Sequence, residues 1–166
     1  MLRYCLRLAI AASAAVVLGS GASRAESWPR EFDPRVEQST CYSRVYSEDF
    51  LKSHPNVKLS IISVSGNAPY SKGSFQLKFE FFGKKQGTYE NYDAIGYCKP
   101  KGAGYACTLE SDGGNVNLIR TSNGFILSTR RVEIERLFSD LVIESTRGGP
   151  TRSFTLRRSK DTLCTY

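Results

Sequence analysis

The acidic segment YACTLESDGGNVNLI, from Tyr105 to Ile119, is the first place where side chains could do chemistry. Glu110 and Asp112 bring two carboxylates close together, as a calcium-binding loop would require. The segment lacks the spaced acids and the closing glutamate of such a loop. Asp-Gly between alternating apolar residues is instead typical of a two-residue hairpin turn. We therefore predict a turn at 112–113, with Glu110 and Asp112 as a tip that could face a partner, and no metal site.

The register of that hairpin follows from the apolar residues on either side of it. A turn centred on Asp112-Gly113 sets Leu109 opposite Val116. It also sets Cys107 opposite Leu118, so all four side chains share one buried face.

A second pair of this type, Asn123-Gly124, predicts another hairpin. It brings Phe125 and Leu127 onto the same buried face as the preceding strand. Two consecutive hairpins that agree on one buried face indicate an antiparallel meander.

Groups suited to catalysis are scarce in this chain. His54, the only histidine, precedes Pro55 at the end of a short predicted helix, where a capping or turn role is the simplest interpretation. One histidine cannot build a histidine metal cluster, and no Gly-x-Ser-x-Gly elbow supports a Ser-His-Asp set. The 16 acids show no spacing that favours a glycosidase pair. We therefore predict a protein that is not an enzyme, with no catalytic residue, no metal and no cofactor.

Four cysteines follow the N-terminal leader, which itself contains Cys5. An even number without a Cys-x-x-Cys motif favours two disulfides, for which three connectivities exist. We favour Cys98 with Cys107 across one hairpin, and Cys41 with Cys164, which would tie the first strand to the last. The second bridge closes the longer loop and should therefore stabilise the fold more than the first. Its own contribution should be roughly 4 to 5 kcal/mol on the chain-entropy account.

Tyrosines are concentrated around the hairpin that the first of these bridges would close. They are Tyr89, Tyr92, Tyr97 and Tyr105. Tyrosine in a sheet is most often a half-buried strand residue. Its apolar ring and polar hydroxyl also suit a barrel rim or an interface. We select Tyr89 and Tyr92, together with Glu110 and Asp112, as candidate partner contacts.

Apolar residues recur at every second position through most of the chain, which is the period of a half-buried strand. The clearest run is Phe75, Leu77, Phe79 and Phe81. One short helix is predicted at 47–53, with Ser47 as its cap. We predict an all-β fold: an antiparallel meander closing into a small barrel of about eight strands, with one short helix after the first strand and two disulfides. The expected core contains Phe75, Leu77, Phe79, Leu109, Val116 and Leu118.

The chain opens with MLRYCLRLAIAASAAVVLGSGASRA, in which arginines precede a short apolar run and small residues. This is the pattern of a secretory signal peptide, residues 1–25, cleaved after Ala25. Residues 26–40 hold two prolines and many charges, which predicts an extended N-terminal arm. Residues 41–166 then form a single β-barrel domain. We expect the mature protein to be periplasmic or secreted, without a transmembrane segment.

Loss of the leader removes three arginines and no acid, so the net charge falls from +7 to +4. Basic pairs such as Lys84-Lys85, Arg130-Arg131 and Arg157-Arg158 could meet an anionic envelope polymer or an acidic protein. An ordinary solvated surface is the favoured interpretation of these pairs. Nucleic acid is not expected as a partner, because no recognised binding motif is present.

Two segments carry a resemblance. CYSRVYSEDFLKSHPNVKLSIISV and YCKPKGAGYACTLESDGGNVNL, with a final cysteine near the C-terminus, resemble a group of small exported bacterial proteins of uncharacterised function. The similarity covers Cys41 to Cys164 and implies export without implying a mechanism. In general outline, the expected barrel is also similar to the small periplasmic barrels that inhibit lysozymes and to lipocalin-like barrels.

Three classes of function remain open from the sequence. The leading one is an exported non-catalytic binding module, such as an inhibitor or an envelope-associated binding protein. The second is a small periplasmic hydrolase with an unrecognised site. The third is an outer-membrane barrel, which a cysteine in the closing strand fits poorly. The partner would be a protein, an envelope polymer or an apolar ligand at the open end of the barrel. A barrel filled by its own side chains would favour a protein or polymer.

Overall fold

The computed structural model of the chain describes residues 28–33, 41–55, 57, 59–85, 88–134, 141–144, 152–159 and 164. Within these ranges, the side chains of residues 70, 84, 85, 88, 89 and 144 are not described. The predicted signal peptide, residues 1–25, lies outside the described residues, as does most of the predicted arm.

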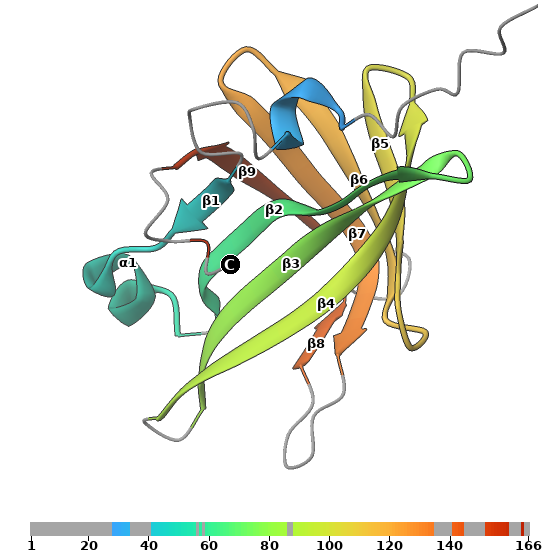
Figure 1. Cartoon of the computed structure of the whole chain (residues 1–166). Helices are drawn as coiled ribbons and strands as arrows, with labels where there is room; N and C mark the ends of the chain where they lie inside the picture. The colour runs from blue at the N-terminus through green and yellow to red at the C-terminus, as the bar shows by residue number, and fades with distance from the viewer. Residues whose placement is uncertain are drawn as a thin grey trace, which may run out of the picture.

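Nine strands form one antiparallel sheet in the described part of the chain, and eight of them close into a barrel (Figure 1). The strands are β1 (Tyr42–Val45), β2 (Leu59–Ser71), β3 (Ser74–Lys85), β4 (Thr88–Lys101), β5 (Gly104–Leu109), β6 (Gly114–Thr121), β7 (Gly124–Ile134), β8 (Leu141–Glu144) and β9 (Arg152–Arg158). Strands β1 to β7 pair in sequence order, and β9 pairs with both β7 and β1 to complete the ring. The predicted barrel is confirmed.

Strand β7 pairs with two strands along one of its edges. Its residues 124–129 pair with β9, whereas its residues 131–134 pair with β8. The opposite edge of β7 is occupied by β6. Strands β8 and β9 therefore follow one another along the same edge, and β8 extends the sheet beyond the ring of eight.

The hairpin between β5 and β6 turns one residue earlier than predicted. Its central residues are Ser111 and Asp112, whose φ angles of 51° and 56° are typical of a type I′ turn. Cys107 consequently lies opposite Val116 and not opposite Leu118. The partners move by two positions, which keeps every side chain on its predicted face.

The glycines that follow these turns explain the displaced register. Gly114 has a φ of 96°, and a side chain there would strike the carbonyl of Arg131 on β7. Gly124 has a φ of 150° and lies equally close to the carbonyl of Leu156 on β9. The second turn accordingly is centred on Ser122-Asn123. Gly114 and Gly124 are therefore needed where a neighbouring strand passes close by, and the glycine of each Asx-Gly pair lies after the centre of its turn.

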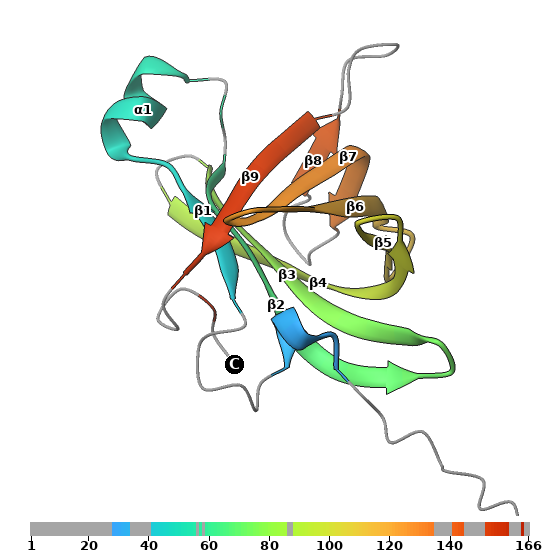
Figure 2. The same cartoon turned by 90° about the horizontal axis from the view of Figure 1, so that it is seen from above.

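The predicted short helix is present as α1 (Glu48–Ser53), which projects from the side of the barrel (Figure 2). The Ser47 hydroxyl accepts a hydrogen bond from the Phe50 amide at 3.2 Å, which is the expected N-cap. His54 stacks on Phe50, with the ring centroids 4.1 Å apart, and its Nδ1 lies 2.9 Å from the Phe50 carbonyl oxygen. These contacts are local to the helix end, as the turn interpretation of His54 predicted.

Both predicted disulfides are confirmed. Cys98 and Cys107 are direct partners on β4 and β5. Cys41, just before β1, is bonded to Cys164, which is 123 positions away in the sequence. The second bridge therefore ties the chain together beside the point where β1 and β9 close the barrel.

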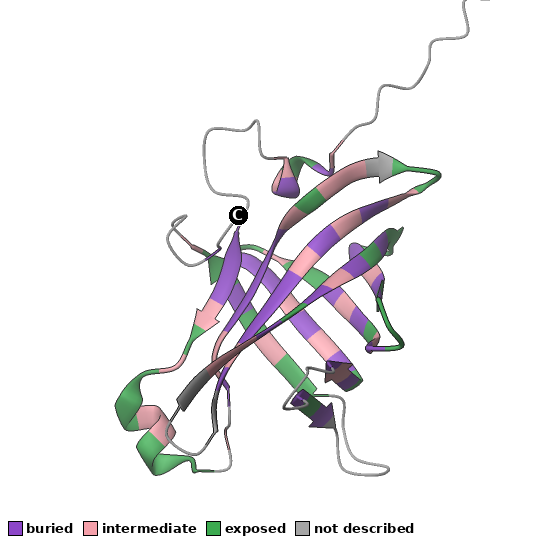
Figure 3. Ribbon diagram, turned by 60° about the horizontal axis from the view of Figure 1, so that its bottom comes forward, coloured by how far each residue is buried: buried purple, intermediate pink, exposed green. Residues whose placement is uncertain are grey.

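The inward faces of the strands hold one continuous apolar core. Buried residues recur along the strands of the barrel (Figure 3). All six predicted core residues are buried in it: Phe75, Leu77, Phe79, Leu109, Val116 and Leu118. The largest fully buried side chains also include Phe81, Phe125, Ile62, Leu127 and Leu156. The interior of the barrel is thus occupied by the protein's own side chains.

One end of the barrel is covered by part of the predicted extended arm. Residues Arg30–Phe32 instead form a short 3-10 turn, η1, and Phe32 is completely buried. The Phe32 ring lies 5.4 Å from those of both Tyr42 and Phe125. Gly66 on β2 makes room for the turn, since a Cβ atom there would lie 2.5 Å from the Phe32 carbonyl oxygen. We call this covered end the mouth of the barrel.

Candidate functional site: a basic pocket at the mouth of the barrel

Of the partner contacts predicted from the sequence, Glu110 and Asp112 are exposed at the hairpin turn, whereas Tyr92 is buried. Tyr92 is only 4% exposed, and its hydroxyl donates to the Glu90 carboxylate. Glu110 is exposed, but its carboxylate accepts a hydrogen bond from the Ile95 amide at 3.0 Å, so it folds back onto β4. Asp112 is exposed at the turn. The side chain of Tyr89 lies outside the described residues.

A pocket of about 810 Å³ lies instead at the mouth, beside η1 and the turn between β6 and β7. It is lined by Arg30, Glu31, Tyr42, Arg120, Thr121, Ser122, Asn123, Gly124, Phe125, Arg157 and Arg158. Four of these residues are arginines and one is an acid, so the lining carries an excess of positive charge. We call it the mouth pocket.

The strands bring the pocket arginines together from distant parts of the sequence. On β9, Arg157 lies opposite Gly124 at the start of β7, and Arg158 lies opposite Tyr42 at the start of β1. Arg120 comes from the end of β6, next to the same turn. The closure of the barrel by β9 therefore builds one side of the pocket.

The single acid of the pocket, Glu31, is held by two donors. One carboxylate oxygen forms an ion pair with the Arg120 guanidinium. The other accepts a hydrogen bond from the Tyr105 hydroxyl at 3.1 Å. Arg120 also donates to that hydroxyl at 3.2 Å, so the three side chains form a closed triad.

Two tyrosines beneath the pocket remain protonated donors. Burial, reinforced by the nearby Glu31 carboxylate, raises the pKa of Tyr105 to about 12. Burial also raises the pKa of Tyr42, although the neighbouring and hydrogen-bonded Arg158 opposes the shift. Both hydroxyls are therefore neutral near pH 7 and can donate a hydrogen bond to an anion.

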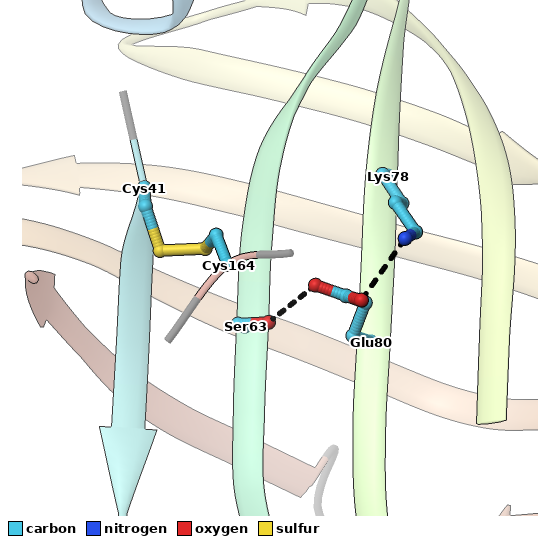
Figure 4. The surroundings of a disulfide bond; sticks show 5 residues. All are labelled: Cys41, Ser63, Lys78, Glu80 and Cys164. Atoms are coloured by element: carbon cyan, nitrogen blue, oxygen red, sulfur yellow. Dashed lines mark hydrogen bonds and ion pairs between the residues drawn. A yellow bond between two sulfur atoms is a disulfide. The ribbon is translucent and has the colours of Figure 1, made fainter. Parts of the chain in front are cut away.

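A second polar cluster lies on the outside of the barrel. Its members, Ser43, Ser63, Ser65 and Glu80, are all buried although alternation along the strands places them on the outer face. The Glu80 carboxylate accepts a hydrogen bond from Ser63 at 3.2 Å and lies 3.0 Å from the Lys78 ammonium (Figure 4). We call this group the outer polar cluster. The Cys41–Cys164 bridge lies on the same face of the sheet (Figure 4).

Sequence patterns point to the mouth pocket only in part: they predict a basic pair at Arg157-Arg158 and a strand tyrosine at Tyr105. They do not indicate Glu31 or Arg120, because these residues are 89 positions apart and only the closed barrel brings them into contact. The apolar residues Trp28 and Phe32 in the charged arm are the local hint that this segment packs against the barrel.

Comparisons with known proteins add no further assignment. Neither a protein-family model, a curated protein nor a solved structure matches the chain. Among the described residues, no three histidine, cysteine or acidic side chains gather as a metal site would require. In the same part of the chain, no helix has the length and apolar character needed to span a membrane.

Proposed function

We propose that this protein is an exported, non-catalytic binding protein that holds an anionic partner at the mouth of its barrel. The observation that carries the proposal is the mouth pocket, in which four arginines surround one acid. Such a concentration of positive charge attracts an anionic surface and accelerates its encounter with the protein.

The filled interior supports a partner that contacts the rim. The core side chains occupy the space that a lipocalin-like barrel would leave for an apolar ligand. A protein or polymer can reach the exposed arginines without entering the barrel. The proposal therefore favours a macromolecular partner over a small apolar one.

Export is supported by two independent features. The leader has the charged, apolar and small-residue regions of a signal peptide. The two disulfides are typical of proteins that fold in an oxidising compartment. The periplasm and the extracellular space are both compartments of this kind.

Binding to defined polymers tests the proposal. Purified oxidised protein should bind poly-glutamate or polyphosphate and ignore neutral dextran, with an affinity that falls as salt rises. Replacing Arg157 and Arg158 by glutamine should weaken that binding by about tenfold. The matched control replaces Arg130 and Arg131, an exposed pair on β7, and should change it little. Equal loss in both double variants would contradict a specific site at the mouth.

A further inference from the structure

The Glu31 carboxylate is bound as a ligand would be bound. Each of its two oxygens has its own donor, Arg120 on one side and the Tyr105 hydroxyl on the other. Two donors directed at the two oxygens of a flat group are the usual means of recognising a carboxylate. The mouth pocket thus contains a carboxylate site that is occupied by a residue of the same chain.

Glu31 can leave this site without unfolding the barrel. Its side chain is 23% exposed and that of Arg120 is 49% exposed, so water reaches the ion pair and weakens it. Glu31 belongs to the three-residue turn η1, outside the barrel sheet. The covering contact is made by the next residue, Phe32, whose ring remains packed between Tyr42 and Phe125. Rotation of the Glu31 side chain is therefore enough to expose the two donors.

The other arginines of the pocket favour an occupant with more than one carboxylate. Arg30, Arg157 and Arg158 line the same pocket as Arg120 and are exposed. Glu31 supplies one negative charge for the four cations. A segment of protein chain with several neighbouring acidic residues would place one carboxylate between Arg120 and Tyr105 and others beside the remaining arginines.

We infer that the mouth pocket recognises an acidic segment of a partner protein, and that Glu31 is a built-in competitor whose carboxylate the partner's carboxylate replaces. The inference rests on the proposed function and adds the chemistry of the partner. The partner's affinity then depends on how much more favourably its carboxylate binds the two donors than the Glu31 carboxylate does. A partner with several acids prevails because it also engages the arginines that Glu31 does not reach.

The test compares three probes on the intact, oxidised protein. They are a labelled peptide of alternating glutamate and glycine, the same peptide with glutamine, and polyphosphate of matched charge. Glu31→Gln removes the competitor and should tighten binding of the glutamate peptide by about threefold to fivefold. Glu133→Gln, which removes an exposed acid paired with Arg131, changes the net charge equally and should leave the affinity unchanged.

Arg120→Gln completes the test. This substitution should weaken binding of the glutamate peptide by about tenfold. In the presence of Arg120→Gln, the gain from Glu31→Gln should disappear, because the competitor and the peptide share that donor. Glu31→Asp retains the charge but shortens the side chain, so it should also tighten binding. It provides a second variant if the amide disturbs η1.

The outcomes separate the two levels of the proposal. Equal tightening in Glu31→Gln and Glu133→Gln would overturn the competitor role and leave only an effect of net charge. Binding of polyphosphate but not of the glutamate peptide, with loss in the Arg157 and Arg158 variant, would overturn the inference and preserve an anion-binding protein. Failure of both probes to bind would overturn the proposed function as well.

Discussion

Two carboxylates, Glu31 at the mouth and Glu80 in the outer polar cluster, both contact a cation and a hydroxyl. Glu31 contacts Arg120 and Tyr105, whereas Glu80 contacts Lys78 and Ser63. Their surroundings differ sharply, because the Glu31 side chain is 23% exposed and that of Glu80 is 1% exposed. The same two kinds of interaction are therefore exposed to solvent at Glu31 and shielded from it at Glu80.

This difference in exposure determines how easily each carboxylate can change its partners. A carboxylate at the surface loses little when it exchanges one set of partners for another, because water and other ions can replace them. A buried carboxylate that loses its cation is left uncompensated in a medium that solvates charge poorly. Glu31 also lies among surplus arginines that attract a second anion. The carboxylate at the mouth can thus exchange its partners, whereas the carboxylate of the outer polar cluster keeps them.

Removing the Cys41–Cys164 bridge, which lies on the same face as the outer polar cluster, should cause the largest loss in the free energy of unfolding. With both cysteines replaced by serine, the free energy of unfolding should fall by about 4 to 5 kcal/mol, since the bridge spans most of the chain. The matched change at Cys98 and Cys107, which are nine positions apart, should cost about 2 to 3 kcal/mol. Urea unfolding of both variants measures the difference. Equal losses would show that the longer bridge stabilises the protein no more than the shorter one.

Glu80→Gln should have the next largest effect. The amide keeps the shape but removes the buried negative charge that interacts with Lys78 and Ser63, which should cost about 2 to 3 kcal/mol of unfolding free energy. Glu31→Gln, the equivalent change at the mouth, should cost less than about 1 kcal/mol. Denaturant unfolding at low and high salt compares them. A greater loss at Glu31 would reverse the roles given to the two carboxylates.

Gly66→Ala tests whether η1 keeps the mouth covered. The new methyl group would lie 2.5 Å from the Phe32 carbonyl oxygen and 2.7 Å from the Trp28 ring, so η1 must shift. We expect a loss of about 1 to 2 kcal/mol in unfolding free energy. Tyr105 should become less buried, and its pKa should fall from about 12 towards 10. Ultraviolet titration of the tyrosines measures this pKa, and an unchanged value would show that η1 does not control the burial of Tyr105.

The last predicted effect is a loss of stability at alkaline pH, and it arises at the mouth. The pKa of Tyr105 is raised from 10.0 to about 12 in the native protein. Below about pH 10 the hydroxyl is protonated in both states and its contribution to stability is complete. As the pH rises towards 12, only the unfolded chain releases the proton, so stability is lost. Wild type should therefore lose about 1 kcal/mol per pH unit relative to Tyr105→Phe in this range.

Unfolding of these two proteins between pH 8 and pH 11.5 measures the effect. Tyr97→Phe, which removes an exposed tyrosine from β4, is the matched control for the loss of one hydroxyl. A constant difference between wild type and Tyr105→Phe across the range would contradict the raised pKa of Tyr105.

The fold could be predicted further than the site because its signals are local. Alternation from Phe75 to Phe81 reports a buried face within a few residues, and the positions of Cys41 and Cys164 indicated the closing bridge. Register was less accessible, because Gly114 and Gly124 are required by strands that approach from elsewhere. Such approaches depend on pairings that no short stretch of sequence contains.

The site depended almost entirely on long-range contacts. Glu31 is 74 positions from Tyr105 and 89 from Arg120. Tyr105 also packs against Phe32 of the arm, with the ring centroids 6.0 Å apart. Predicted contacts such as Tyr92 were selected by residue type, but the parity of β4 directs that side chain into the core. Residue type shows what a side chain can do, whereas the closed barrel decides what it meets.

The position of β9 between β1 and β7 has a consequence for the newly made chain. A polypeptide that emerges N-terminus first presents β1 and β7 before β9 arrives, so both strands retain an open edge. Open edges are templates for pairing with other chains. Until β9 docks, aggregation therefore competes with closure of the barrel, and the supply of chaperones where the chain folds will govern how much closed barrel is recovered.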